Sequence, residues 1–356
     1  MGKCAVVMMN LGGPDKKDSV QPFLFNLFND PAIISVPGPL RWLLAQLISR
    51  KRAPVAQSIY QKIGGGSPLL QETEAQARAL GQSLGDEYRT FVSMRYWHPR
   101  SDEVVRAVQS YDPEKIVLLP LYPQYSSTTT GSSVGDWNSA AARLGLDKPT
   151  YVVGCYATNP HFISAHSKLV RGFLESSNPN HPQKVLFSAH GLPEKIIAKG
   201  DPYKSQVERT AQAIVKKLAC PRLEWEVCYQ SRVGPLRWIG PSTEELIAEA
   251  GTSRKSLVVV PIAFVSEHSE TLVELDIEYA DLARRAGVPS YQRVPTLGIS
   301  EDFMLGLESM VKSVSSWVGG EPGQEASSCP PDLHLCCKNL SNPDGSHPPV
   351  WSGNEP

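Results

Sequence analysis

The sequence lacks both an excess of charge of either sign and any long hydrophobic run. Its 356 residues include 35 Lys and Arg against 36 Asp and Glu, a formal net charge of -1. Nucleic-acid-binding proteins usually carry a basic excess, so the overall charge gives no support to that class, and we expect no nucleic-acid partner. No apolar stretch reaches the roughly 20 residues of a membrane-spanning helix. With 41% hydrophobic residues, the chain is typical of a globular protein long enough for two domains.

Three other signals are also missing. The apolar residues after Met1 are too few for the h-region of a secretory signal. The G-x-G-x-x-G spacing of a dinucleotide site does not follow the first predicted strand, so we expect no bound nucleotide. Seven cysteines, an odd number, do not suit a disulfide framework. These absences predict a cytoplasmic protein whose thiols are free or bind a metal.

Short apolar runs that end in Pro or Gly alternate with helical patterns along the chain. Such a βα alternation predicts parallel sheets. Residues 116–123 resemble residues 257–264, because each is a strand that runs into a proline. We therefore predict an α/β fold of two similar Rossmann-like lobes, each a parallel β-sheet flanked by helices, with a cleft between them. Two coincidental strand–proline runs are the alternative.

The predicted lobes cover residues 1–150 and 151–318. The last helix of the second lobe, at about residues 300–318, is expected to pack back on the first. Residues 319–356 form a tail rich in Pro, Ser, Asn and Gly, which cannot bury enough apolar surface to order itself. Three of the seven cysteines lie in this tail: Cys329, Cys336 and Cys337. A metal or cluster that fixes the tail is the better interpretation of their grouping.

Ionisable side chains are concentrated just after the predicted strand at residues 256–260. Glu270, Glu274 and Glu278 are spaced four apart, so a regular helix would place all three on one face. Like charges at that spacing repel by roughly a few tenths of a kcal/mol per pair. His268 lies just upstream, at a strand's C-terminal end, where α/β folds bind ligands. The stretch alone favours a metal site and a solvated acidic helix face equally.

A second unusual stretch, residues 31–52, is rich in large apolar side chains and ends in Arg50-Lys51-Arg52. That combination suggests contact with a membrane surface or an apolar ligand. The alternative is a buried helix whose basic end suits its dipole. Pro31, Pro37 and Pro39 interrupt regular packing and slightly favour the first interpretation.

Eight motifs occur in one order along the chain: residues 10–14, 64–68, 94–96, 122–126, 188–193, 200–203, 230–235 and 261–279. Together they resemble ferrochelatase, the family that catalyses the terminal step of haem synthesis, over about residues 6–307. The resemblance implies two Rossmann-like lobes around a porphyrin cleft. It also implies a lyase that inserts ferrous iron, its substrate, into protoporphyrin IX to form protohaem.

The resemblance assigns His190 as metal ligand and as base for the pyrrole protons, with Glu270 as its acidic partner across the cleft. His268, Glu274 and Glu278 would continue from that site as a path for metal or protons. Two N–H protons must leave as iron arrives, so a base that titrates near the working pH is needed. Imidazole and carboxylate can hold ferrous iron in transit.

Substrate contacts are implied in the same way. Four side chains match the apolar and aromatic walls that would bend the macrocycle: Leu11, Tyr96, Trp238 and Phe264. Three more match positions that contact the porphyrin propionates or the rim of the cleft: Arg52, Ser67 and Arg95.

The resemblance also implies a 2Fe-2S cluster. Animal members use a cysteine at the position of Ser127, whereas some bacterial members use one further along with a C-terminal trio. Four thiolates match the bacterial pattern: Cys155, Cys329, Cys336 and Cys337. A zinc site and unligated thiols are the alternatives. The remaining cysteines are expected to be buried thiols: Cys4, Cys220 and Cys228.

Residues 31–52 match the family's apolar lip over the pocket mouth. This match predicts loose attachment to the cytoplasmic face of the inner membrane, where protoporphyrin would be received from the preceding haem-pathway oxidase. The chain would act as a monomer or homodimer. The competing functions are a coproporphyrin ferrochelatase, a cobalt chelatase, and a non-catalytic porphyrin- or iron-binding sensor.

Overall fold

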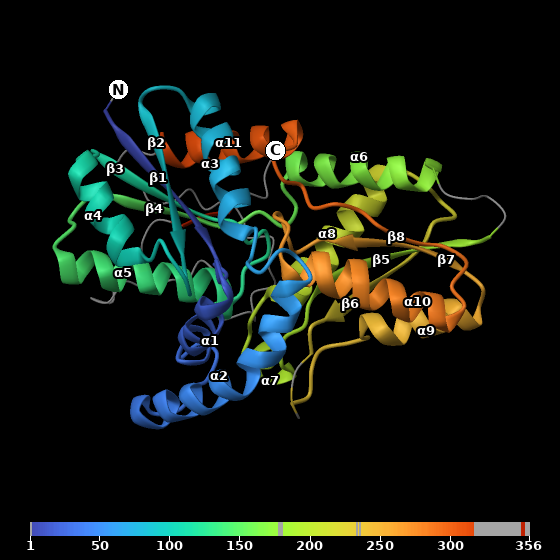
Figure 1. Ribbon diagram of the computed structural model, residues 1–356. Helices are drawn as coiled ribbons and strands as arrows, with labels where there is room; N and C mark the ends of the chain where they lie inside the picture. The colour runs from blue at the N-terminus through green and yellow to red at the C-terminus, as the bar shows by residue number, and fades with distance from the viewer. Residues whose placement is uncertain (1, 177–180, 233, 235, 317–349, 353–356) are drawn as a thin grey trace. The chain divides into compact units, whose positions relative to one another are not determined.

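The computed structural model describes residues 2–176, 181–232, 234, 236–316 and 350–352. They divide into two compact units (Figure 1). The first unit holds residues 2–155, 307–316 and 350–352, and the second holds the described residues from 156 to 306. Within the described residues, we find no helix with the length and apolar character needed to cross a membrane.

A five-stranded parallel sheet in the order β2-β1-β3-β4-β9 forms the centre of the first unit. The strands are β1 (Cys4–Asn10), β2 (Tyr88–Met94), β3 (Lys115–Pro120), β4 (Thr150–Cys155) and β9 (Val350–Ser352). Every residue of β1 is buried, which explains why its sequence is continuously apolar up to Asn10. The helical elements are η1 (Lys17–Ser19), α1 (Val20–Phe28), α2 (Gly38–Gln61), α3 (Leu69–Leu84), α4 (Ser101–Tyr111), η2 (Ser127–Gly131) and α5 (Ser132–Leu144).

The second unit contains a four-stranded parallel sheet in the order β6-β5-β7-β8. Its strands are β5 (Gln183–His190), β6 (Glu224–Gln230), β7 (Ser256–Pro261) and β8 (Tyr291–Arg293). The helical elements are α6 (Pro160–Ser176), α7 (Glu194–Ile197), α8 (Tyr203–Leu218), α9 (Thr243–Thr252), η3 (Glu270–Tyr279) and α10 (Ala280–Ala286). One helix, α11 (Glu301–Ser315), begins in the second unit and belongs to the first from Leu307 onward.

Both sheets confirm the predicted fold class, and they share a strand order. In each, the first strand of the unit lies between the second and the third, and the fourth follows the third. The similar segments 116–123 and 257–264 contain β3 and β7, which are equivalent in the two orders. The switch point of such a sheet lies where the order of strand addition reverses, between β5 and β7 in the second unit. Ligands of α/β proteins bind at the carboxyl ends of the strands at this point.

Two findings concern the C-terminal part of the chain. Residues 350–352 of the predicted tail form β9, which pairs with β4, with Val350 opposite Val152 and Ser352 opposite Cys155. Backbone hydrogen bonds hold such an edge strand without requiring a large apolar surface. The end of α11 is joined to the first unit by a hydrogen bond of 2.8 Å between Tyr88 Oη and Ser315 Oγ.

Candidate active site

The switch point of the second sheet brings His190 and Glu270 together. His190 is the last residue of β5, and Glu270 is the first residue of η3, a helix that follows β7 after a short loop. His190 Nδ1 lies 2.9 Å from Glu270 Oε2, within hydrogen-bond distance. Both residues belong to the second unit, where they are in direct contact.

Each member of this pair changes the pKa of the other. Burial disfavours a charged imidazole, but the Glu270 carboxylate outweighs it and raises the pKa of His190 above its ordinary 6.5. Burial likewise disfavours the carboxylate, but His190 and then His268 outweigh it and hold the pKa of Glu270 well below its ordinary 4.5. The stability from His190 is complete below pH 6.5 and is lost as pH rises through the raised pKa. The stability from Glu270 is present above pH 4.5 and is lost as pH falls through the lowered pKa.

His268 lies on the other side of Glu270. Its Nε2 is 3.8 Å from Glu270 Oε2, and its ring centroid is 4.6 Å from that of Phe264. Its Nδ1 is buried and has no hydrogen-bond partner in the described part of the chain. The sequence-predicted residues His268 and Phe264 are thus in contact with each other, and His268 faces the reactive pair.

Glu274 is held by several donors rather than left free. It accepts hydrogen bonds from Gln230 Nε2 at 3.0 Å, the Ser231 backbone N–H at 2.8 Å, the Ser231 hydroxyl, and Tyr279 Oη at 3.0 Å. Ser231 has a φ of 61°, an uncommon conformation for a non-glycine residue. Burial and the nearby Glu270 carboxylate raise the pKa of Glu274. Sequence analysis placed Glu274 correctly near the site but missed these partners, although residues 230 and 231 lie in one of the eight motifs.

The helix that carries the glutamates differs from expectation. η3 is a π-helix of 10 residues, not a regular α-helix. Its i→i+5 hydrogen bonds are rare and are often found at functional sites. Glu270 and Glu274 are partly buried, whereas Glu278 is exposed. The three carboxylates therefore range from a buried position beside His190 to the surface.

Arg293 of β8 pairs with one acidic residue in the loop before η3 and with another inside η3. Its Nη1 lies 2.6 Å from Glu267 Oε1, and its Nε lies 2.8 Å from Asp276 Oδ1. Glu267 precedes His268 by one residue, and Asp276 lies within η3. The arginine thus ties the loop that carries His268 to the middle of the π-helix, which limits the movement of both.

Trp238 completes the predicted residues of the second unit. It forms an isolated β-bridge with Pro193, three residues beyond His190. Its indole Nε1 is buried and has no hydrogen-bond partner among the described residues. Its ring also lies against Gly191, where an added Cβ would come within 3.4 Å of it. Trp238 is therefore next to the segment that follows His190.

In the first unit, Arg95 and Tyr96 surround a buried aspartate that sequence analysis missed. Asp30 Oδ2 lies 3.0 Å from Arg95 Nη2 and accepts from Tyr96 Oη at 2.6 Å and from Ser132 Oγ. Arg95 also lies 3.3 Å from Asp136. Tyr96 is only 1% exposed and belongs to an apolar cluster that Leu11 contacts. Two carboxylates therefore offset the charge of Arg95, and the ring of Tyr96 is largely enclosed.

The remaining predicted contacts of the first unit are Arg52 and Ser67. The Arg52 guanidinium lies 5.5 Å from the centroid of the Phe28 ring, and no carboxylate pairs with it within the described residues. Ser67 N–H donates to Pro14 C=O at 2.7 Å, and Ser67 Oγ accepts from Leu69 N–H at 3.3 Å. Two backbone N–H groups at the start of α3 are thus already hydrogen-bonded within the first unit.

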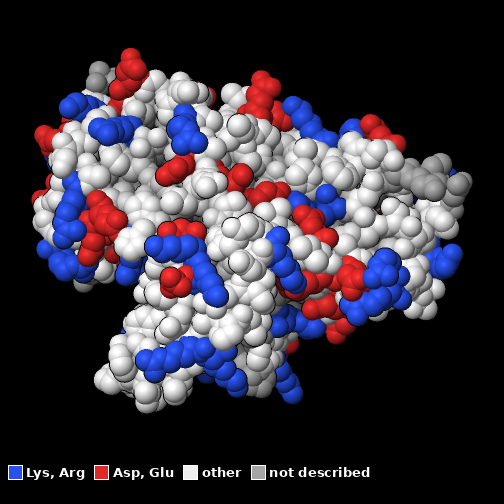
Figure 2. Space-filling model, viewed as in Figure 1, with Lys and Arg blue, Asp and Glu red and all other residues white. Residues whose placement is uncertain are grey.

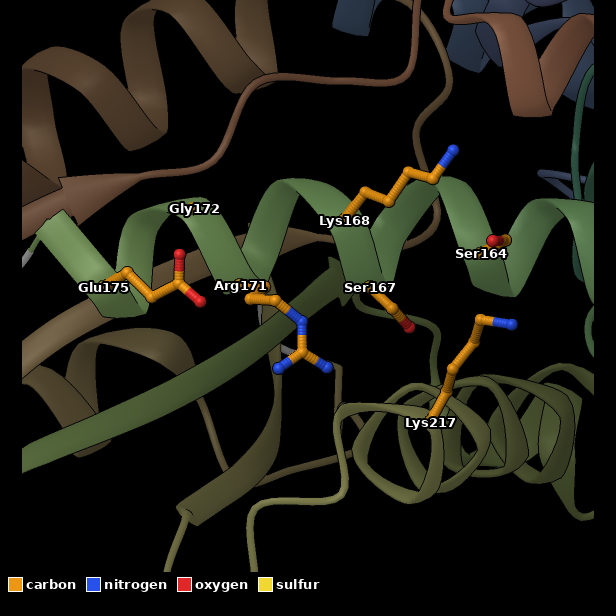
Figure 3. Close-up of a pocket in the computed structure, with 7 residues that line it drawn as sticks. All are labelled: Ser164, Ser167, Lys168, Arg171, Gly172, Glu175 and Lys217. Atoms are coloured by element: carbon orange, nitrogen blue, oxygen red, sulfur yellow. The ribbon is translucent and has the colours of Figure 1, made fainter.

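A basic surface pocket of about 340 Å³ lies between α6 and α8 of the second unit (Figure 3). Lys168, Arg171 and Lys217 line it, and Arg171 Nη2 donates to Leu218 C=O at 3.0 Å. None of the predicted site residues lines this pocket. Among the residues with described placement, no group of three His, Cys, Asp or Glu side chains could hold a metal ion.

The pairing of His190 with Glu270 can be tested by titration. We expect Glu270→Gln to lower the pKa of His190 below 6.5, because burial then acts without the neighbouring charge. Histidine ring ¹⁵N and ¹H shifts followed against pH would measure the midpoint. Glu278→Gln, which changes an exposed residue at the far end of η3, is the matched control and should leave the midpoint in place. An unchanged midpoint in the Glu270 variant would contradict the geometry.

Comparisons with known proteins agree with the family resemblance seen in the sequence motifs. A family model described as Ferrochelatase matches residues 3–315. A ferrochelatase from Caulobacter vibrioides (strain NA1000 / CB15N) is 52% identical over 332 residues, 92% of this chain and 94% of that protein. A ferrochelatase from Pelagibacter ubique (strain HTCC1062) is 51% identical over 315 residues, 87% of this chain and 90% of that protein.

Among solved structures, SirB from Bacillus subtilis with Fe3+ matches with a TM-score of 0.51 and 13% identity, covering 88% of this chain and 96% of that one. The sirohydrochlorin chelatase SirB from Bacillus subtilis subspecies spizizenii, in complex with cobalt, has a TM-score of 0.53 and 11% identity, with 88% and 95% covered. At such identity the likeness concerns the fold alone. The family model and the close relatives carry the assignment, and the chain belongs to the ferrochelatase family.

Proposed function

We propose that the chain inserts ferrous iron into protoporphyrin IX to form protohaem, with His190 as the base and as a transient ligand of the substrate iron. The observation that carries this proposal is the His190–Glu270 hydrogen bond at the switch point of the second sheet. Family membership supplies the reaction, and the geometry supplies the groups that such a reaction needs. A carrier or sensor of porphyrin has no need of a base held in this way.

The carboxylate determines which ring nitrogen is available. With Nδ1–H donating to Glu270, the neutral His190 ring presents Nε2 as its acceptor. Once the iron has left His190 Nε2, that nitrogen takes a pyrrole proton, and the Glu270 carboxylate stabilises the imidazolium that forms. His268 lies beside Glu270, and Glu274 and Glu278 follow along η3 to the surface, so we assign these three residues to a path for protons or metal. Two protons leave for each iron that enters, which balances the charge.

Turnover of a His190→Ala variant tests this function. We expect the rate of haem formation from protoporphyrin IX and ferrous iron, measured anaerobically by absorbance, to fall at least about a hundredfold, the scale of a lost general base. His98→Ala is the control, because that histidine is 60% exposed and pairs only with Glu103. Full turnover by His190→Ala would rule out the proposed role. Wild-type rates that are higher with coproporphyrin or cobalt would favour the corresponding alternative substrate.

We retain the predicted porphyrin contacts and consider them within each unit separately. Phe264 and Trp238 lie near the reactive pair, and Leu11 and Tyr96 belong to one apolar cluster in the first unit. Of the two arginines, Arg52 is better suited to a propionate, because Asp30 and Asp136 already offset the charge of Arg95. We assign Ser67, whose hydroxyl also holds the turn before α3, to the rim of the site. Arg95 contributes N–H donors to the substrate but little net positive charge.

We also propose that Cys155 is one ligand of a 2Fe-2S cluster. Cys155 is buried at the end of β4, directly opposite Ser352 of β9, so the tail returns to this cysteine. The other three proposed ligands lie outside the described residues: Cys329, Cys336 and Cys337. Val350 follows Cys337 by 13 positions, and at roughly 3.3 Å per residue that length allows the trio to reach Cys155. Four thiolates suit this cluster, which would supply redox-active iron apart from the substrate iron.

Spectroscopy of the purified protein tests the cluster. Anaerobically isolated protein should show visible absorption and, after reduction, an EPR signal of a 2Fe-2S centre. Cys155→Ser should remove both, whereas Cys228→Ser should retain them. Cys228 is a buried thiol of β6 whose pKa burial raises to about 12, so it is a poor ligand and a matched control. Colourless, iron-free wild-type protein would contradict the proposal.

Attachment to the cytoplasmic face of a membrane is proposed for the exposed side of α2. Leu40, Leu43 and Leu47 lie at helical spacing and are each about half exposed, and Trp42 is 52% exposed beside them. Figure 2 shows this helix as mainly uncharged surface with basic side chains among it. Such a face suits an anionic membrane and the collection of an apolar porphyrin from the preceding oxidase, whether the chain acts alone or as a homodimer.

Vesicle binding tests the attachment. Co-sedimentation with phosphatidylglycerol vesicles should fall severalfold in Leu43→Glu/Leu47→Glu, because charge opposes burial in the interface. Leu305→Glu changes an exposed leucine of α11 and serves as the control. Equal co-sedimentation of all three proteins would contradict a role for α2.

A further inference from the structure

Three buried polar side chains form a hydrogen-bonded chain that ends at Glu270 and Glu274. Thr243, Ser188 and Gln230 are each 0% exposed. The hydroxyls of Thr243 and Ser188 lie 3.1 Å apart, and Ser188 Oγ donates to Gln230 Oε1 at 2.8 Å. Each member comes from a different element, namely α9, β5 and β6. The chain therefore joins three parts of the second unit at one point.

The far end of this chain is the Gln230 amide nitrogen. Gln230 Nε2 donates to Glu274 Oε2 at 3.0 Å and to the Glu270 backbone C=O at 3.2 Å. A backbone carbonyl and an ionised carboxylate can only accept, which fixes the orientation of the amide. With its oxygen on Ser188 and its two N–H groups on Glu270 and Glu274, the Gln230 side chain has no unused donor.

The position of Gln230 in the sheet explains how one side chain can contact both β5 and η3. Gln230 is the last residue of β6 and is paired in register with His190, the last residue of β5. Its side chain crosses to the start of η3, where Glu270 contacts His190. The π-helix is thus fixed to the strand that carries His190 through a neutral amide. A neutral donor can hold the Glu274 carboxylate and the Glu270 backbone carbonyl without adding a charge to a buried site.

We propose that Gln230 is a positioning residue that sets the geometry of Glu270 and Glu274 for the passage of ferrous iron. It acts through those glutamates and does not itself contact the substrate. The inference rests on the proposed roles of His190 and Glu270. It concerns the iron step alone and leaves porphyrin binding to other residues.

Two substitutions separate hydrogen bonding from simple space filling. Gln230→Met keeps a similar shape but donates nothing, and Gln230→Glu keeps an acceptor for Ser188 but places a second carboxylate against Glu274. We expect kcat/KM for ferrous iron to fall roughly tenfold in Gln230→Met, the scale of one hydrogen bond to a charged group, and further in Gln230→Glu. The KM for protoporphyrin should stay within about twofold in both. A role in stability alone would not produce this split between the two substrates.

Gln109 in the first unit provides a matched control for Gln230. Gln109→Met removes the same kind of bond, from Gln109 Nε2 to Leu144 C=O at 2.9 Å, in the first unit and should leave both constants unchanged. If Gln230→Met does not fold, Ser188→Ala frees the amide oxygen and should give a smaller fall of the same kind. Wild-type kcat/KM for iron in Gln230→Met, or an equal rise in the KM for protoporphyrin, would overturn the inference. Full activity of Glu270→Gln would instead overturn the proposed site itself.

Discussion

The hydrogen bond between His190 and Glu270 is the interaction on which the proposed chemistry of the second unit depends. It exists because β5 and β7 are neighbours in a parallel sheet, so the residues that follow their carboxyl ends meet at one edge. Each residue favours the charged form of the other, so the pKa of His190 is raised and that of Glu270 is lowered. The contact uses Nδ1 of His190 and leaves Nε2 for the proposed role as base and transient ligand.

Such a pair needs support from elements that do not react. Arg293 joins Glu267 to Asp276 and so holds the loop and the π-helix on one side, while Gln230 fastens the start of the helix on the other. Ser231 contributes both its backbone N–H and its hydroxyl to Glu274, at the cost of an uncommon φ. The carboxylates therefore sit in a frame of fixed donors, in which a small displacement of one group leaves others unsatisfied.

The sequence predicted the fold class because buried parallel strands require continuous apolar runs and βα connections impose their order. The motif resemblance predicted His190 and Glu270 as site residues and predicted their roles, but it did not give their positions in space. In the structure, both residues belong to the second unit. The π-helix was missed, since a shift of backbone hydrogen bonds by one residue hardly changes the side-chain pattern. Gln230 and Asp30 were missed because their partners lie 40 or more residues away, and β9 because three residues show no periodicity.

The two arginines of the first unit differ in how far nearby carboxylates offset their positive charge. Their sequence positions do not show this difference. Arg95 lies between Asp30 and Asp136, so an approaching propionate would meet two carboxylates as well as the guanidinium. Arg52 instead lies over the Phe28 ring, where it retains its full positive charge and its N–H donors for a substrate carboxylate. The three hydrogen bonds on Asp30 show what Arg95 does in the first unit: it holds the connection between α1 and α2 to the end of β2. Arg95 thus has a structural role, whereas the surroundings of Arg52 support its proposed contact with a propionate.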